Sequence, residues 1–409
     1  MKTKRAWIVA FATIFAGVSL ALVQNKVAPS MTTLMDAFSI DMATAGWLSS
    51  LFSLVGIVIA IPTAVILNKV GPKKGGIIAL ACAVVGSLIG VLSGGSVAIL
   101  MASRVIEGMG VGLMSVIGPS LIAMWFPEAK RGLPMSIWAA YQMGAQAVMF
   151  FLGAMLTSSF GWQGVWWFGL AACVVALVFY ILCVKSPRPE DSYADVESDD
   201  VSIAEGIKSP SAWILSLATM LFCIGCFGFV NWIATCWAQT FSWGEGEANM
   251  WVGYFSIFGV VAAVIIGALL NRVKNRKLFG VVMLIAYGAA SVFGMFMDNP
   301  SFLIGFVIVY GFVDAGFPCV LWTMAAQTVK KPELAGVALG VVSIGFNVGV
   351  LLGPPIIGAI VEAAGWHAGA IAICASCVLG AVVLLFTKLY SADGASEHEG
   401  AERTVPSAL

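Results

Sequence analysis

The sequence predicts an all-helical membrane protein with twelve spans, arranged as two pseudo-symmetric six-helix bundles. Three observations lead to this fold class: the composition, the placement of Lys and Arg, and a repeat between the two halves of the chain. Hydrophobic residues make up 60% of the 409 positions and charged residues 10%, whereas soluble domains average about 45–50% and about 25%. The formal net charge is zero, which gives no support for a nucleic-acid partner.

Twelve apolar stretches are long enough to cross a bilayer, which takes about 20 residues. In order they cover 6–33, 44–67, 75–94, 97–125, 134–157, 164–184, 211–240, 248–270, 278–297, 301–327, 335–361 and 366–389. The first six predict an N-terminal bundle at 1–184 and the last six a C-terminal bundle at 211–390. Residues 185–210 are acidic and rich in Pro and Ser, which predicts a cytoplasmic linker. The tail at 391–409 is polar and predicted to be disordered.

Basic residues fix the predicted orientation. All but two of the 21 Lys and Arg residues lie at the chain ends or in alternate gaps between the stretches, and the intervening gaps hold none. Because short cytoplasmic loops retain Lys and Arg while translocated loops lose them, we expect both termini to be cytoplasmic and the protein to lie in a bacterial inner membrane. The two exceptions are Lys26 and Arg104, which fall inside predicted spans.

The two halves repeat each other at nearly one offset. The segment 64–74 corresponds to 267–277 at an offset of 203, Gly161-Trp162 recurs as Gly365-Trp366 at 204, and 104–108 corresponds to 311–315 at 207. Membrane proteins built from such repeats bind their cargo near the midplane, between the halves.

On these residues the chain resembles the major facilitator superfamily of secondary transporters. That family carries G-x-L-x-D-R-x-G-R-[RK] after its second helix, and its fourth helix carries R-x-x-[QE]-G-x-G. The matches here are Asn68, Lys69, Gly71, Lys73 and Lys74 in the first loop, Asn271 and Arg272 in its second copy, and Arg104, Glu107, Gly108 and Gly110 in the fourth span. The resemblance covers about residues 5–390 and implies a monomer that works by alternating access.

The resemblance also implies that the loop residues switch the carrier between conformations: Asn68, Lys69, Gly71, Lys73, Asn271 and Arg272. Asn68 and Asn271 stand where the family has aspartate, which weakens the charge-relay latch of that loop. The Gly-Pro pattern of proton-driven exporters is absent from the fifth span, which counts against drug efflux. The chain looks more like bacterial members that move small anions, cyanate and nitrate among them, although the glycine-rich nitrate signature is absent.

Four residues of strong charge lie within the predicted membrane: Lys26, Arg104, Glu107 and Asp314. Each costs about 2.5–3.5 kcal/mol on insertion scales, so each should face a cavity or a partner. Helices one and four line the central cavity in the resembled fold. Lys26 and Arg104 are therefore predicted to present two positive charges to one pocket and to bind an anionic, carboxylate-like substrate.

Each cation has an alternative role. Arg104 and Glu107 are three residues apart on one helix, so they share a face and are placed to pair with each other. Lys26 has no acid nearby in the sequence, and its alternative is to extend from the helix end into the outer headgroups.

Asp314 is the first candidate for proton coupling and Glu107 the second. Asp314 lies midway along the tenth span, and the spans of that half hold no cation except Lys388 at the very end of the twelfth. Burial away from water favours the protonated form of a carboxylate, so Asp314 could take up a proton on one side and release it on the other. The alternative is a packing contact that accepts hydrogen bonds from Tyr310 or Asn347.

Uncharged polar residues within the spans complete the predicted substrate site. They are Asn25, Gln142, Gln146, Asn231, Trp232 and Asn347. Their alternative role is hydrogen bonding between helices.

Together these features predict a secondary transporter for a small organic or inorganic anion, working by proton symport or anion exchange. The alternatives are proton-driven efflux of hydrophobic or cationic compounds and a receptor that binds without transport. No nucleotide-binding loop, metal-ligand spacing or nucleophile–base set occurs in the sequence, so neither enzyme activity nor a cofactor is predicted.

Overall fold

The computed structural model describes residues 2–59, 70–127, 130–185, 203–270, 272–273, 275–331 and 334–390. The N-terminal half contains α1 (Lys2–Asn25), η1 (Ala28–Ser30), α2 (Met31–Phe38), α3 (Met42–Ser50), α4 (Ser53–Ile59), α6 (Pro72–Val91), α7 (Val97–Trp125), α8 (Gly132–Phe160) and α9 (Gln163–Cys183). The C-terminal half contains α10 (Ile203–Ile207), α11 (Pro210–Phe241), α12 (Glu245–Leu270), α13 (Arg276–Phe296), η4 (Pro300–Phe302), α14 (Leu303–Ala326) and α15 (Ala335–Leu385). Most of the predicted linker and the whole predicted tail lie outside the described residues.

The described helices account for the twelve predicted spans. Ten are long and apolar enough to cross a membrane, and the bent pair α3 and α4 forms an eleventh. The twelfth comes from α15, whose 51 residues would be about 76 Å long at 1.5 Å per residue, far more than a bilayer needs. Its backbone leaves the helical region at Gly365, where φ is 83° and ψ is 174°. Glycine tolerates this conformation without steric cost, so α15 is two spans joined there.

The first two spans are interrupted, which the prediction of continuous helices at 6–33 and 44–67 missed. The first consists of α1, the short turn η1 and α2, with a break at Lys26 and Val27. The second is divided at Leu51 and Phe52, where α3 and α4 are bent by 45°. Each break leaves backbone carbonyl groups at the end of a helix without their usual partners.

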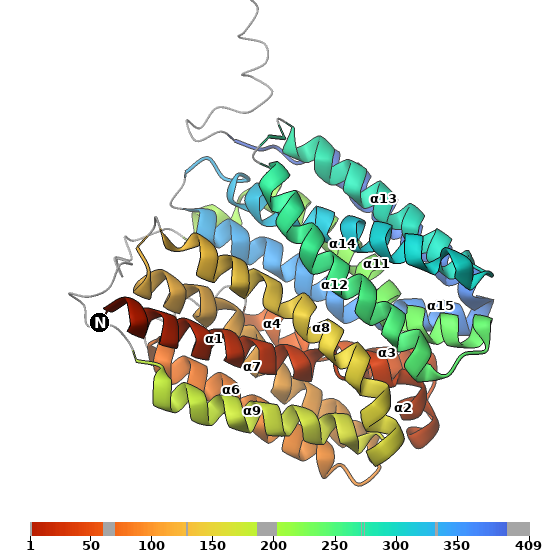
Figure 1. Cartoon of the computed structure of the whole chain (residues 1–409). Helices are drawn as coiled ribbons and strands as arrows, with labels where there is room; N and C mark the ends of the chain where they lie inside the picture. The colour runs from red at the N-terminus through yellow and green to blue at the C-terminus, as the bar shows by residue number, and fades with distance from the viewer. Residues whose placement is uncertain are drawn as a thin grey trace, which may run out of the picture.

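The two halves lie side by side and meet near the end that carries α2 and α3 (Figure 1). There Thr33 donates to Glu245 at 2.9 Å, Asn249 donates to the Pro29 carbonyl at 2.7 Å, and the Met42 backbone N–H donates to Glu362 at 3.2 Å. The loops at this end are the ones without Lys or Arg. We call it the outer end and the opposite one the basic end.

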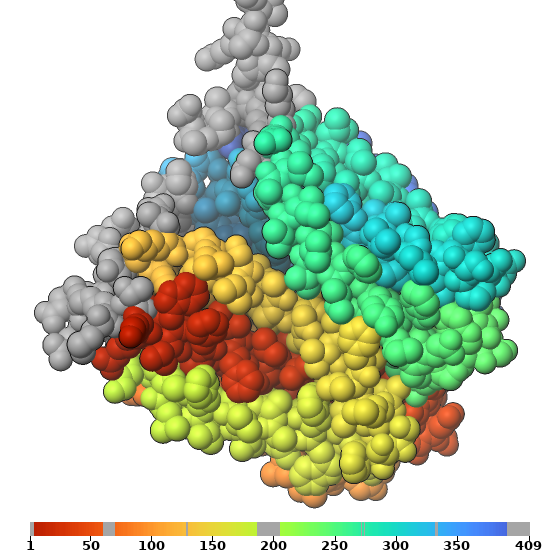
Figure 2. Space-filling view, in the orientation of Figure 1, coloured from red at the N-terminus to blue at the C-terminus, as the bar shows by residue number. Residues whose placement is uncertain are grey.

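A recess opens between the halves toward the basic end. Figure 2 shows it between α8 and α12, with part of α15 visible at its base. The contacts between α8 and α12 run from Ala154 and Gly246 near the outer end to Met143 and Gly259 near the middle of each helix. The structure is therefore closed at the outer end and hollowed from the basic end.

Close backbone approach at Gly46 makes the outer closure possible. A Cβ atom at Gly46 would lie 2.5 Å from the Pro355 nitrogen and 2.6 Å from the Pro354 carbonyl carbon of the opposite half. Backbone atoms cannot move aside as the end of a flexible side chain can. A larger residue here must push α3 and α15 apart.

We therefore expect Gly46→Val to favour a conformation that is open at the outer end. Overpacking costs about 1–3 kcal/mol, equivalent to a shift of about 5-fold to 150-fold in a two-state equilibrium. The measurement is disulfide formation between cysteines placed at Thr33 and Glu245, which should fall in the Gly46→Val background. Gly144→Val is the control, because a Cβ there meets nothing within 4 Å. Equal cross-linking in both backgrounds would contradict the prediction.

Candidate functional site

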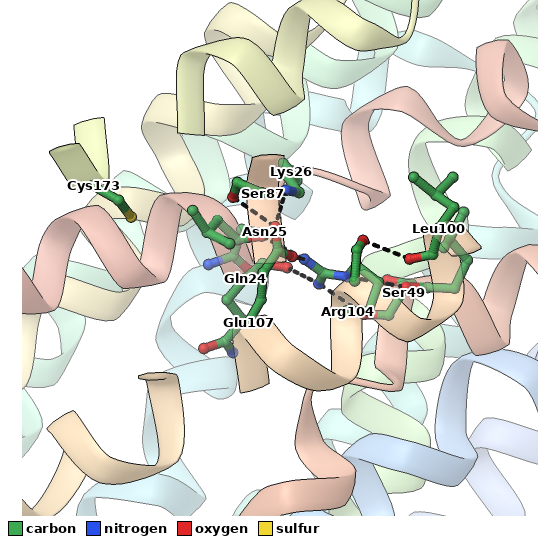
Figure 3. Close-up of polar contacts among 12 residues, drawn as sticks. Gln24, Asn25, Lys26, Ser49, Ser87, Leu100, Arg104, Glu107 and Cys173 are labelled. Atoms are coloured by element: carbon green, nitrogen blue, oxygen red, sulfur yellow. Dashed lines mark hydrogen bonds and ion pairs between the residues drawn. The ribbon is translucent and has the colours of Figure 1, made fainter. Parts of the chain in front are cut away.

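Three charged residues form a sealed cluster inside the N-terminal half (Figure 3). Lys26 lies in the break after α1, while Arg104 and Glu107 lie one turn apart on α7. Lys26 Nζ is 2.6 Å from Glu107 Oε1, and Arg104 Nη1 is 2.6 Å from Glu107 Oε2. All three side chains are 0% exposed. One carboxylate thus pairs with two cations, which leaves a net charge of +1 on this buried cluster.

Arg104 uses all five of its N–H donors within the protein. One bonds to Glu107, and the other four bond to backbone carbonyl groups. These are Leu48 at 3.2 Å, Val23 at 2.8 Å, Gln24 at 3.0 Å and Ser49 at 3.4 Å. The guanidinium therefore has no donor left for a ligand in this conformation.

The four carbonyl groups identify what Arg104 holds together. Val23 and Gln24 belong to the last turn of α1, and Leu48 and Ser49 to the last turn of α3. These are the carbonyls that the helix breaks leave unpaired, and a cation at a helix C-terminus is also favoured by the helix dipole. Arg104 thereby ties two broken spans to α7.

Glu107 is fully occupied as well. Its Oε1 accepts from Lys26 and from the Ser87 hydroxyl, each at 2.6 Å. The Lys26 ammonium also lies 4.3 Å from the centroid of the Trp166 ring, a cation–π contact. Buried charges need such complete pairing, because removing one partner leaves an uncompensated charge in a medium of low polarity.

This cluster corrects two expectations. Lys26, which has no acid nearby in the sequence, pairs with Glu107 across 81 positions instead of extending into headgroups. Lys26 and Arg104 do not present their charges to an open pocket, because both are enclosed and bonded. The alternative of an Arg104–Glu107 pair is present in the structure. A direct contact between either cation and a substrate stays a prediction.

Asp314 lies in the C-terminal half, within α14, and is 8% exposed. The thiol of Cys226 on α11 donates to its Oδ1 at 3.7 Å. The two neighbours that were expected to donate to Asp314 bond elsewhere. The hydroxyl of Tyr310 pairs with that of Tyr287, and the amide of Asn347 donates to the Ser343 carbonyl. Within the described part of the C-terminal half, Lys and Arg in the spans occur at the basic end, as Arg276 and Lys277.

The uncharged residues of the predicted site divide into two groups. Asn231, Gln146 and Asn347 lie between the halves, because Asn231 accepts from Ser49, Gln146 donates to Ser256 at 3.0 Å, and Asn347 abuts Gly56. Trp232 is fully buried and donates to the Pro354 carbonyl within its own half. The structure thus places the first three at the interface, at separate contacts between helix pairs, and places Trp232 in the core.

Asn25 and Gln142 are half-buried. The amide of Asn25 donates to the Ala21 carbonyl at 2.9 Å, one turn back on α1. Their role in binding a substrate stays a prediction.

The loop motif is described in part. Asn68, Lys69 and Asn271 lie outside the described residues. Gly71 has φ of 78° and is the N-cap residue of α6, and Lys73 Nζ donates to the Ile181 carbonyl at 3.3 Å. The backbone N–H of Arg272 donates to Leu269 at the end of α12. The switching role that the resemblance implies for these residues stays a prediction.

Sequence reasoning missed the residues that connect the charged cluster to its surroundings. Ser87 bonds to Glu107, while Ser49 contacts Arg104 through its carbonyl and Asn231 of the opposite half through its hydroxyl. Serine within an apolar span is a weak signal, because such hydroxyls usually bond to their own helix. The sequence alone therefore does not single out either serine as a contact of the charged cluster.

The chain resembles known proteins both in sequence and in fold. A family model described as Major Facilitator Superfamily matches residues 9–244 and 215–408. Among curated proteins, the chain is 23% identical over 265 residues to a protein named TsgA homolog from Yersinia pestis (strain Pestoides F) and, equally, to one from Yersinia pseudotuberculosis serotype O:1b (strain IP 31758). These matches cover 63% of this chain and 65% of the length of those relatives.

Two solved structures share the fold. One is the crystal structure of a bacterial homolog of the human lysosomal transporter Spinster, in an inward-facing and unoccupied conformation. It matches with a TM-score of 0.74 and 16% identity over 94% of this chain and 95% of that one. The other is the human organic anion transporter MFSD10 (TETRAN), with a TM-score of 0.68 and 16% identity over 93% and 99%. At this identity the likeness concerns the fold.

Proposed function

This chain belongs to the major facilitator superfamily of secondary transporters, and from that premise we propose that it carries a small anion across the membrane together with protons. It would do so as a monomer, by alternating between a form closed at the outer end and a form closed at the basic end. Transport of one anion in exchange for another is the related mode that the same site supports.

The charge balance of the buried residues is the observation that carries this proposal. The cluster of Lys26, Arg104 and Glu107 has a net charge of +1, and an ionised Asp314 cancels it. When Asp314 binds a proton, the interior is left with one uncompensated positive charge. Charge in a medium of low polarity is costly, so an anion that enters the recess restores neutrality. A proton and an anion therefore favour each other's binding, and such coupling is reciprocal.

In this reading the cations attract the anion through their field and need not touch it. Arg104 and Lys26 are held by backbone and side-chain partners, which keeps the net positive charge fixed in position. Asp314 is better placed to titrate, because its partner in the structure is a thiol and not a cation. Asp314 is thus the proposed proton carrier, and Glu107 serves as the counter-ion of two cations.

The orientation follows from the basic loops. If they face the cytoplasm, as the positive-inside rule requires, the recess at the basic end opens inward and the outer end faces the opposite side. Both termini would then be cytoplasmic, and the membrane would be a bacterial inner membrane.

Proton-driven efflux of a hydrophobic cation is the second candidate, and Asp314 is the observation that favours it. A carboxylate without a neighbouring cation can pair with a cationic cargo as well as with a proton. The net charge of +1 on the N-terminal cluster opposes this function, because it repels a cation within the same recess.

Proton movement driven by the cargo itself tests the proposal. Purified protein is reconstituted in liposomes that contain the pH-sensitive dye pyranine, and anions are added outside. Anions of strong acids, namely methanesulfonate, benzenesulfonate and nitrate, are used because they do not carry protons across the bilayer as neutral acids. We expect internal acidification that is absent from protein-free liposomes. Alkalinisation on adding tetraphenylphosphonium, or no acidification with any of the three anions, would overturn the proposed symport of an anion with protons.

A further inference from the structure

Three aromatic side chains of the C-terminal half form a continuous surface apart from the charged residues of the proposed site. They are Phe227 on α11, Trp322 on α14 and Phe346 on α15. The ring centroids of Phe227 and Phe346 are 6.0 Å apart with their planes at 89°, and those of Trp322 and Phe346 are also 6.0 Å apart. We call these three residues the aromatic surface.

The aromatic surface faces the opposite half of the protein. Phe227 lies one turn before Asn231, and residues four apart share a face of a helix. Asn231 accepts a hydrogen bond from Ser49 of the N-terminal half. Phe346 packs against Phe227, and Asn347 on the same turn of α15 abuts Gly56 of that half. Both contacts place the aromatic surface at the interface between the bundles, on the basic-end side of the Ser49–Asn231 bond.

The aromatic surface is open, unlike several aromatic residues in the middle of the same helices. Trp322 is 41% exposed, and Phe227 and Phe346 are half-buried. By contrast, Phe222 and Phe229 on α11 and Phe317 on α14 are sealed in the core. Cys226 lies beside Phe227 in the chain and contacts Asp314. An open apolar surface therefore adjoins the proposed proton carrier.

We propose that the aromatic surface binds the apolar body of an organic anion, such as an aryl or branched-chain carboxylate or sulfonate. This inference rests on the proposed function and specifies its substrate class. Ligand sites combine an apolar lining with a few charged or polar groups that fix orientation. A small inorganic anion has no apolar part to desolvate these rings, whereas a flat organic body stacks against them. The charged end then lies toward the N-terminal cluster and the protonated Asp314.

Two anions that differ by a ring test this inference in the same dye-filled proteoliposomes. Benzenesulfonate and methanesulfonate carry the same fixed charge. We expect benzenesulfonate to reach half-maximal acidification at a concentration about ten-fold lower, as the burial of one aromatic face predicts. Trp322→Ala and Trp322→Leu should remove this preference, so that the two sulfonates reach half-maximal acidification at similar concentrations.

Trp167→Ala is the matched control, since Trp167 is a 53% exposed tryptophan on α9 of the other half. If methanesulfonate and nitrate act while benzenesulfonate does not, or if both Trp322 variants behave like Trp167→Ala, the aromatic surface is not the site and the proposed function stands. If none of the three anions causes acidification, the proposed symport of an anion with protons falls and this inference with it.

Discussion

Replacing Glu107 by glutamine is expected to destabilise the protein by about 3–5 kcal/mol, the cost of removing one partner from a buried ion pair. Glutamine keeps the shape of the side chain but removes the charge, so the cluster changes from +1 to +2 with every member enclosed. Lys26 and Arg104 would repel each other, which would weaken the attachment of α1 and α3 to α7 through Arg104. The measurement is the fraction of monodisperse protein that remains after heating, followed by size-exclusion chromatography.

Two variants make this result specific. Glu247→Gln removes an exposed carboxylate at the start of α12 and should melt as the wild type does. The double variant Lys26→Met with Glu107→Gln returns the cluster to +1, so it should be more stable than Glu107→Gln alone, and a double-mutant cycle gives the coupling between the two residues. Equal melting of Glu107→Gln and Glu247→Gln would show that the carboxylate does not compensate the two cations.

The fold could be predicted from the sequence because the features that indicate it lie within short segments and recur along the chain. The length of each apolar stretch indicates one span, and the alternation of Lys and Arg indicates on which side each loop lies. The 203-residue offset between the two loops indicates that the halves repeat. The interruptions at Lys26 and Leu51 were not accessible, because no proline or glycine stands at either position. Pro29 follows the first break, and the sequence from Leu51 to Leu54 reads as continuous apolar helix.

The sequence offers the candidate site as a set of residues but not as an arrangement. Lys26, Arg104, Glu107 and Asp314 were identified because charge within a span is costly and therefore rare. Their partners were not, because Lys26 and Glu107 are 81 positions apart and come together through tertiary packing. The four carbonyl groups that bind Arg104 carry no sequence signal at all, since every residue has one. Only the structure therefore distinguishes a cation whose donors are free for a ligand from one whose donors bond to two helix ends.

Replacing Asp314 by asparagine is expected to abolish anion-driven proton entry while exchange of one anion for another continues. Asparagine fits the same space, but it cannot ionise, so the interior keeps its positive charge whether or not a proton is available. The anion then binds without a proton, and the return of the empty carrier, which requires neutrality, is impaired. In the pyranine assay the signal should fall to that of protein-free liposomes, whereas counterflow of labelled benzenesulfonate between loaded vesicles and medium should persist.

Asp298→Asn is the matched control, because Asp298 is exposed in the turn after α13 and lies far along the chain from the cluster. It should retain both activities. Loss of both activities in Asp314→Asn would indicate a structural role for the carboxylate beside Cys226, and full acidification in that variant would exclude Asp314 as the proton carrier. In the second case Glu107 becomes the remaining buried acid within the described spans. Its protonation would free one of two cations and would couple proton binding directly to the ends of α1 and α3.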